Sequence, residues 1–164
     1  MGFKLNRMKK QINIELEVYN NINELPEIEQ SLVLKAKEIA KKAYAPYSKF
    51  NVGAALLLDN GEIVSGNNQE NAAYPSGICA ERTAIFYANA QYPNQAVTTL
   101  AVAVFRNGEY AEQPVTPCGS CRQVMLETEN RFQKPMRVIM TGEKQIYVAE
   151  SVKDLLPLSF DSLD

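Results

Sequence analysis

The three cysteines of this 164-residue chain are the residues whose type and spacing point most directly to chemistry. Cys79 stands two residues before Glu81. Cys118 and Cys121 follow Pro117 as a Cys-x-x-Cys pair. An odd number of cysteines argues against a closed set of disulfides. The sequence holds no histidine, which excludes histidine as base, nucleophile partner or metal ligand. A catalytic metal would therefore be held by thiolates and carboxylates.

Three thiolates form a ligand set that suits Zn²⁺, which prefers four tetrahedral ligands and binds sulfur well. Three protein ligands leave a fourth position for water, which is typical of catalytic rather than structural zinc sites. Glu81 lies close enough along the chain to reach such a water without binding the metal. Together these residues predict an activated hydroxide with a carboxyl group beside it for proton transfer.

Each part of this pattern also has a simpler interpretation. Cys118 and Cys121 alone are compatible with a redox pair, with half of a structural zinc site, or with two buried thiols. Glu81 alone is typical of a solvated acid on a helix. A structural zinc site, however, would lack its fourth ligand, so the joint spacing of the two segments favours a catalytic metal.

Both cysteine segments lie at the start of a predicted helix. The first helix is predicted over residues 79–91 and the second over residues 119–131. The first turn of a helix presents unpaired N–H groups and a partial positive charge, and both stabilise a thiolate. Cys118 and Cys121 are three residues apart and share one helix face. Two helix starts that face each other would therefore gather all three sulfurs around one ion.

The rest of the chain alternates strands with helices. Apolar and polar residues alternate over residues 12–18, which predicts a short strand, and helical spacing extends over residues 26–45. A hairpin is predicted over residues 50–58 and 62–65, and three further strands are predicted over residues 99–105, 136–141 and 146–148. A last short helix is predicted over residues 152–155. This order predicts a single α/β catalytic domain over residues 24–164, preceded by an N-terminal extension over residues 1–23 that carries the short strand.

Charge and hydropathy limit the classes of partner. Acidic residues exceed basic ones by 19 − 17 = 2, so no strong positive field attracts nucleic acid. No apolar run approaches the ~20 residues of a membrane span. The pattern of a signal peptide is absent from the N-terminus. We therefore expect a cytoplasmic protein with neither nucleic acid nor membrane as a partner.

Two segments carry a specific combination of residues: Cys79-Ala80-Glu81-Arg82 and Pro117-Cys118-Gly119-Ser120-Cys121-Arg122-Gln123. Further segments agree with them in order: Tyr44-Ala45-Pro46-Tyr47-Ser48, Phe50-Asn51-Val52-Gly53-Ala54-Ala55, Asn68-Gln69-Glu70-Asn71-Ala72 and Leu155-Leu156-Pro157-Leu158-Ser159-Phe160. With these motifs the chain resembles, over residues 27–160, the small homotetrameric type of zinc-dependent cytidine deaminase.

This resemblance implies a fold and a reaction. The fold is a three-layer α/β/α domain, with a mixed five-stranded sheet and helices on both faces. The reaction is hydrolysis of cytidine and deoxycytidine to uridine and deoxyuridine plus ammonia, in pyrimidine salvage. Cys79, Cys118 and Cys121 are implied to bind one Zn²⁺ per subunit. Zinc-bound hydroxide is implied to attack C4, with Glu81 as the proton shuttle. Arg82 is implied to donate hydrogen bonds to the ligand sulfurs and so to offset their negative charge.

The resemblance also assigns the contacts to the nucleoside substrate. Asn68 and Glu70 are implied to hydrogen-bond the ribose, and alternation places both on one side of an extended chain. Phe50 is implied to pack against the base. The backbone N–H of Ala80 is implied to hold the pyrimidine carbonyl.

Two aromatic residues, Tyr74 and Phe160, are implied to reach the site from neighbouring subunits. The active sites of a homotetramer would then be shared, and a monomer would be inactive. The sequence departs from the family pattern at Asn51, where proline is common, and at Thr116, where serine is frequent. Neither departure falls on an implied zinc ligand.

Other interpretations stay open on the sequence alone. An aminohydrolase for a different cytosine-like substrate, such as a blasticidin-type antibiotic, shares the zinc segments and differs at Phe50, Asn68 and Glu70. A zinc-stabilised binding protein has no use for Glu81 beside an open metal position. A thiol redox protein requires the Cys-x-x-Cys pair to cycle through a disulfide.

Overall fold

A mixed sheet of seven strands organises residues 8–161, the part of the chain that the computed structural model describes. The strands are β1 (Glu17–Tyr19), β2 (Asn51–Leu58), β3 (Ile63–Asn67), β4 (Val97–Arg106), β5 (Glu109–Tyr110), β6 (Arg137–Thr141) and β7 (Ile146–Ala149). Their order is β1-β7-β6-β4-β2-β3, and β5 pairs with one end of β4. Strands β4 and β6 run parallel, and the remaining pairs of these strands are antiparallel.

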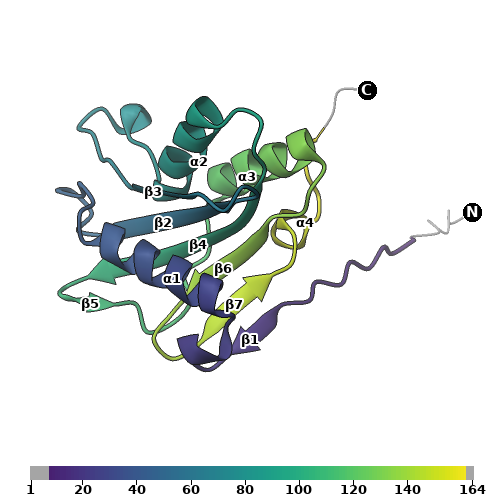
Figure 1. The fold of residues 1–164 in the computed structure, drawn as a ribbon, viewed down its shortest axis with the longest axis horizontal. Coiled ribbons are helices and arrows are strands. Elements are labelled where there is room, and N and C mark those ends of the chain that lie inside the picture. The colour runs from purple at the N-terminus through teal and green to yellow at the C-terminus, as the bar shows by residue number, and fades with distance from the viewer. Residues whose placement is uncertain (1–7, 162–164) are drawn as a thin grey trace, which may run out of the picture.

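Helices cover both faces of this sheet (Figure 1). They are α1 (Glu27–Ala40), α2 (Ala80–Gln91), α3 (Gly119–Phe132) and α4 (Val152–Leu155), with short 3-10 turns at Ile22–Glu24 and Tyr74–Ser76. Buried residues of α1 form one core with one face of the sheet, and those of α2, α3 and α4 form a second core with the other face. The three-layer α/β/α prediction is therefore confirmed. Within residues 8–161, no helix is both long enough and apolar enough to cross a membrane.

Strand β2 shows why both faces of the sheet must be covered. Its residues are apolar almost without interruption, and alternate side chains enter different cores. Ala54 and Leu56 pack in the core with α2 and α3, whereas Ala55 packs in the core with α1. A strand that is apolar on both sides fits only in the middle layer of such a fold.

The sheet has seven strands where five were predicted. The five predicted ones correspond to β2, β3, β4, β6 and β7. The additional strands are β1, which comes from the N-terminal extension, and the two-residue β5. Strand β5 follows β4 through a turn in which Asn107 and Gly108 both have positive φ angles. Such a short hairpin arm carries too few residues for a periodic signal in the sequence.

The predicted strand over residues 12–18 forms only at its end, as β1. Glu17 and Tyr19 pair with Val148 and Ile146 of β7, whereas the described residues before Glu17 pair with no strand. Arg137 on β6 holds β1 in place, because its guanidinium donates to Glu17 at 2.7 Å and to the Tyr19 hydroxyl at 3.3 Å. Residues 1–7 of the predicted extension and residues 162–164 of the predicted domain lie outside the described range.

Helix α1 ends at Ala40, earlier than the predicted residue 45. The chain then turns so that Tyr44 lies beside residues 68–70. The backbone N–H of Tyr44 donates to Asn68 at 3.0 Å, and the N–H of Glu70 donates to Tyr44 at 2.8 Å. These distant pairings override the local helical pattern and position residues 68–70, which line the cavity described below.

Gly66 on β3 allows α2 to approach the sheet closely. A Cβ atom at this position would lie 2.6 Å from the backbone N of Ala84 and 2.9 Å from the carbonyl oxygen of Ala80. Both atoms belong to the first turns of α2. The absence of a side chain at Gly66 therefore fixes where α2 begins.

Candidate metal centre and cavity

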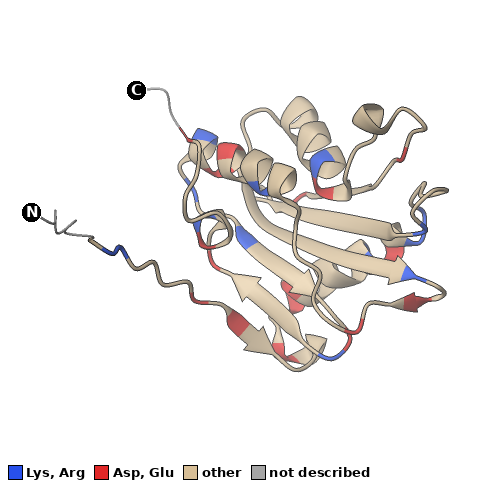
Figure 2. Ribbon diagram, turned by 180° about the vertical axis from the view of Figure 1, so that it is seen from behind, with Lys and Arg blue, Asp and Glu red and all other residues tan. Residues whose placement is uncertain are grey.

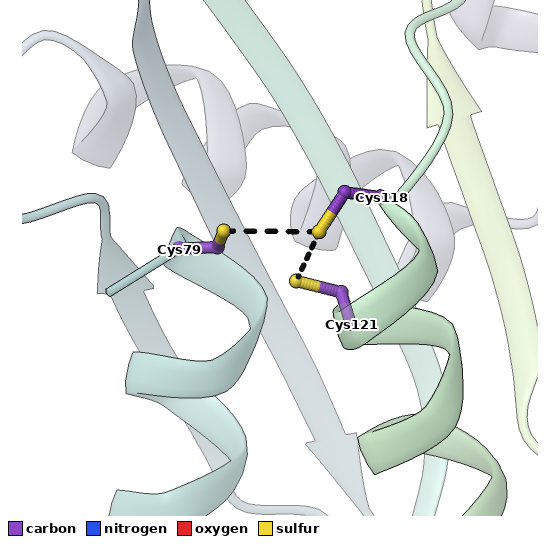
Figure 3. A group of neighbouring side chains, drawn as sticks. All are labelled: Cys79, Cys118 and Cys121. Atoms are coloured by element: carbon purple, nitrogen blue, oxygen red, sulfur yellow. Dashed lines mark hydrogen bonds between the residues drawn. The ribbon is translucent and has the colours of Figure 1, made fainter. Parts of the chain in front are cut away.

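Two helices on the same face of the sheet, α2 and α3, begin side by side and bring the cysteines together (Figure 3). Cys79 is the N-cap residue of α2, and Cys118 is the N-cap residue of α3. Neither side chain caps its own helix by a hydrogen bond, so both thiols remain available as ligands. Cys121 lies in the first turn of α3 and points toward the other two sulfurs (Figure 3).

The three sulfur atoms have the spacing of a metal ligand set. All lie within 4.8 Å of one another. The Sγ atoms of Cys79 and Cys118 are 3.9 Å apart, and those of Cys118 and Cys121 are 3.4 Å apart. Tetrahedral zinc with Zn–S bonds of ~2.3 Å requires sulfurs separated by ~3.8 Å. The donor set therefore fits zinc in both chemistry and spacing.

Negative charge in this cluster collects first on Cys79. Hydrogen bonding from Cys121 and the neighbouring Arg82 lowers the pKa of the Cys79 thiol to about 5, against the opposing effect of burial. The pKa of Cys121 is raised in turn by its hydrogen bond to Cys79 and by burial. Three thiolates so close together repel one another, and a divalent cation between them would relieve this repulsion.

Arg82 lies one turn after Cys79 on α2. Its guanidinium donates to the Cys79 sulfur at 3.4 Å, while its buried Nε has no hydrogen-bond partner within the described residues. The side chain therefore places positive charge directly against a candidate ligand. This is the location that its implied role requires.

Glu81 occupies the first turn of α2 and is only 4% exposed. Burial raises the pKa of its carboxyl group, and the negative charge of Cys79 adds to this effect. Hydrogen bonds from its own backbone N–H and from Cys121 oppose the rise. A buried carboxyl group with a raised pKa is well suited to gain and lose a proton during a reaction.

A cavity of about 760 Å³ opens above this cluster. Its lining includes most of the residues singled out in the sequence: Phe50, Asn68, Glu70, Tyr74, Cys79, Glu81, Arg82 and Cys118. Cys121 is fully buried behind them. The volume lies within the usual range for small-molecule sites, roughly 300–1,000 Å³.

Asn68 and Glu70 are both held by backbone groups of residues 47–52. The Asn68 amide accepts from the N–H of Val52 at 2.7 Å and donates to the carbonyl of Phe50 at 2.9 Å. One carboxylate oxygen of Glu70, Oε2, accepts from the N–H groups of Tyr47 and Ser48. Hydrogen bonds from Ser48 and Tyr47 lower the pKa of Glu70, which keeps it ionised.

The remaining residues assigned by the resemblance, Ala80, Tyr74 and Phe160, differ in their relation to the cavity. Ala80 is the first residue of α2, so its N–H has no partner within the helix. Tyr74 is 79% exposed and lines the cavity of its own chain. Phe160 is not part of the lining; it is 68% exposed, and its carbonyl accepts from Gln123 at 2.7 Å.

The cavity also contains residues that no sequence argument selected. Tyr47 packs edge-to-face with Tyr74, at 6.4 Å between ring centroids. Val102 on β4 and Val115, which precedes α3, contribute apolar side chains to the cavity lining. Tyr47 belongs to one of the motifs that carry the resemblance, so the sequence could have identified it as a site residue. Val102 carries no local signal, since an apolar residue in a central strand is expected in any case.

A family model and individual relatives of known name point to the same protein family. The model of the cytidine and deoxycytidylate deaminase zinc-binding region matches residues 26–134. The cytidine deaminase of Sporosarcina psychrophila is 42% identical over 135 residues, which are 82% of this chain and 93% of that protein. The cytidine deaminase of Halalkalibacterium halodurans is 40% identical over 136 residues, with 82% and 96% coverage.

Solved structures agree with this comparison. The crystal structure of cytidine deaminase from Burkholderia pseudomallei superposes with a TM-score of 0.68 at 40% identity and covers 79% of this chain and 97% of that one. The crystal structure of cytidine deaminase from Mycobacterium tuberculosis gives a TM-score of 0.65 at 31% identity, with 82% and 98% coverage.

Proposed function

The chain belongs to the family of cytidine and deoxycytidylate deaminases with a zinc-binding region, and from this membership we propose that it hydrolyses the exocyclic amine of cytidine and deoxycytidine. The products are uridine or deoxyuridine and ammonia. The observation that carries the proposal is the meeting of three cysteine sulfurs and the buried Glu81 at one cavity of about 760 Å³.

Cys79, Cys118 and Cys121 are the residues that would hold the zinc cofactor. When bound, zinc supplies a Lewis acid that makes water nucleophilic near neutral pH. Arg82 keeps Cys79 in the thiolate form and reduces the net negative charge of the ligand set. Because the described residues bring together three ligands, a tetrahedral ion held by them would have one position open to water.

Glu81 moves the protons. Its carboxylate takes a proton from the attacking water and delivers it to N3 of the pyrimidine, which makes C4 more electrophilic. The oxygen of water becomes the C4 carbonyl oxygen of the product. A second proton passes through Glu81 to the exocyclic nitrogen, which leaves as ammonia. The raised pKa of Glu81 suits a group that must both accept and return a proton.

The nucleoside is held by residues that line the cavity and by the first N–H of α2. Oε1 of Glu70 accepts from a ribose hydroxyl, while Oε2 fixes the 47–48 loop. Asn68 keeps one amide hydrogen for the same sugar. Phe50 packs against the base, and the free N–H of Ala80 donates to the pyrimidine carbonyl.

We also propose that the protein works as a homotetramer with shared active sites. Leu158 and Phe160 are exposed by 76% and 68%, although both are apolar. The bond between Gln123 and the Phe160 carbonyl fixes this part of the tail on α3. Phe160 then enters the cavity of a neighbouring subunit, and Tyr74 completes the wall at the junction. Three free thiols that must remain reduced suit the cytoplasm, where the reaction serves pyrimidine salvage.

The test is ammonia release from cytidine by the wild type and by Glu81→Gln, with bound zinc quantified in both. We expect turnover by the wild type. The zinc-loaded variant should lose roughly 10²–10⁴-fold in kcat, because the amide cannot carry the proton.

The outcomes separate the alternatives. Zinc-loaded wild type that leaves cytidine untouched overturns the substrate assignment and directs the assay to other cytosine-like compounds. A wild type that binds no zinc and forms a disulfide between Cys118 and Cys121 instead supports a thiol redox protein.

A further inference from the structure

Residues 8–16 form an arm that extends away from the body of the molecule (Figure 1). Each of its residues is exposed, and no hydrogen bond joins it to any other part of the described chain. The arm continues directly into β1, which is the last strand in the sheet order and has a free outer edge. Unpaired strand edges of this kind are ready to pair with another strand.

The arm and β1 carry the pattern of a strand that is apolar on one face. Ile12, Ile14, Leu16 and Val18 alternate with polar residues and are between 38 and 53% exposed. Successive side chains of a strand point to opposite faces, so these four share one face. The opposite face at β1 is fixed by Arg137, which binds Glu17 and the Tyr19 hydroxyl. The apolar stripe is therefore oriented and uncovered.

Charge along the arm is divided by sign. Lys9 and Lys10 lie toward its outer end, and Glu15 and Glu17 lie toward the body (Figure 2). An antiparallel partner with the same sequence reverses this order. Its basic half then lies opposite the acidic half of the first chain, so the arm is complementary to itself.

We propose that residues 8–18 pair in antiparallel fashion with the same residues of a second copy of this chain. A two-fold axis through Asn13 sets Lys9 opposite Glu17, Ile12 opposite Ile14 and Met8 opposite Val18. The two sheets then join through β1 into one continuous sheet. This contact involves neither the cavity nor the tail that contains Phe160.

Other registers are less favourable on the same grounds. A two-fold axis through Glu15 sets the two Glu15 carboxylates against each other. A shift by one residue sets the apolar face of one chain against the polar face of the other. The register centred on Asn13 sets Ile12 against Ile14 and Met8 against Val18 on one face, where Lys10 lies opposite Leu16, and it sets Lys9 opposite Glu17 on the other face.

The test uses cysteine substitutions in the full-length zinc-loaded protein under mild oxidation. In Asn13→Cys the two new sulfurs face each other across Cα atoms about 4.5–5.5 Å apart, within disulfide range. In the matched control Lys9→Cys the same residues are roughly 27 Å apart across the pair. We expect Asn13→Cys to give a covalent dimer on a non-reducing gel, and Lys9→Cys and the wild type to remain monomeric there.

A second experiment fixes the register and the contact. Gln11→Cys and Glu15→Cys should each fail to cross-link alone and should form a mixed covalent dimer when combined. Adding Ile14→Lys to Asn13→Cys should abolish the dimer without changing the melting temperature of the domain. An Asn13→Cys protein that cross-links no more than Lys9→Cys overturns the proposal, as does cross-linking that survives Ile14→Lys. Ammonia release from cytidine should be the same in all these variants, so failure of this contact and failure of the deaminase assignment are told apart.

Discussion

Negative charge at the metal centre is shared by three sulfurs and one buried carboxyl group, and the guanidinium of Arg82 is bonded to a sulfur there. The Cys79 thiol ionises first because Cys121 and Arg82 stabilise its thiolate. Glu81 keeps a raised pKa because it is buried and lies near that thiolate. The balance among these groups decides both how acidic the metal is and how basic Glu81 is.

Arg82→Gln should therefore weaken catalysis more than folding. The variant removes the positive charge that offsets the thiolates, so the bound metal becomes a poorer Lewis acid. We expect kcat to fall roughly 10–100-fold, as for other groups that support metal ligands. Steady-state kinetics with zinc content determined on the same sample checks this. Arg82→Lys, which keeps the charge, should recover part of the loss; equal kcat in wild type and Arg82→Gln would remove the proposed role.

Glu70→Gln distinguishes the roles of the two carboxylate oxygens of this residue. The amide oxygen can still accept from Tyr47 and Ser48, whereas the amide nitrogen replaces the oxygen that we propose as the acceptor for the sugar. We expect KM for cytidine to rise about 10–100-fold, since a bond to a charged group contributes about 1.5–3 kcal/mol. The melting temperature should change little. Glu70→Ala should lower both affinity and stability, and an unchanged KM in Glu70→Gln would mean that the residue only supports the loop.

At the scale of secondary-structure elements, the site depends on where α2 begins. Gly66 leaves 2.6 Å between a hypothetical Cβ and the backbone of Ala84, so Gly66→Ala must displace the first turns of α2. We expect a loss of about 1–3 kcal/mol in unfolding free energy and faster loss of zinc to a chelator. Denaturant unfolding and chelator competition measure both.

Gly119→Ala is the matched control for this prediction. It lies at the start of α3 beside Cys118, and a Cβ there meets nothing within 4 Å. We expect wild-type stability and wild-type zinc retention. If Gly66→Ala behaves in the same way as Gly119→Ala, close packing of α2 on β3 does not position the site.

The boundaries of the helices and strands show how much of the fold can be predicted from the sequence alone. The helices that carry the cysteines were predicted almost to the residue, because their signals are local: a proline or glycine before the first turn and helical periodicity after it. The end of α1 at Ala40 was missed, since it depends on backbone bonds between Tyr44 and residues 68–70. The anchoring of Asn68 by Val52 and Phe50 depends on the same long-range pairing. Strand β5 was missed because two residues are too few to show the alternation of apolar and polar residues that identifies a strand.

At the scale of the whole molecule, the metal would join two helices that belong to different parts of the chain. Binding only to the folded state stabilises that state by mass action. At free zinc 1,000-fold above the dissociation constant the gain is about 4 kcal/mol, or roughly 8–16 °C in melting temperature. A chelator should remove this gain from the wild type.

Cys121→Ser is the control for the chelator experiment. It should melt at the temperature of the metal-free wild type and should not respond to the chelator. Thermal scans at one fixed protein concentration compare the two, because assembly also makes the melting temperature depend on concentration. A wild type that is indifferent to the chelator would show that zinc has no structural effect.

The parallel pairing of β4 with β6 has a consequence for the order of folding events. Cys79 and Cys118 are 39 residues apart in the chain, and the helices that carry them precede these two strands. We therefore expect the sulfurs to meet after β4 and β6 have come together, because contacts between distant residues form slowly. Tight zinc capture should therefore report on a late step of refolding. In a stopped-flow experiment with a zinc indicator, we expect capture to follow formation of the native sheet and never to precede it.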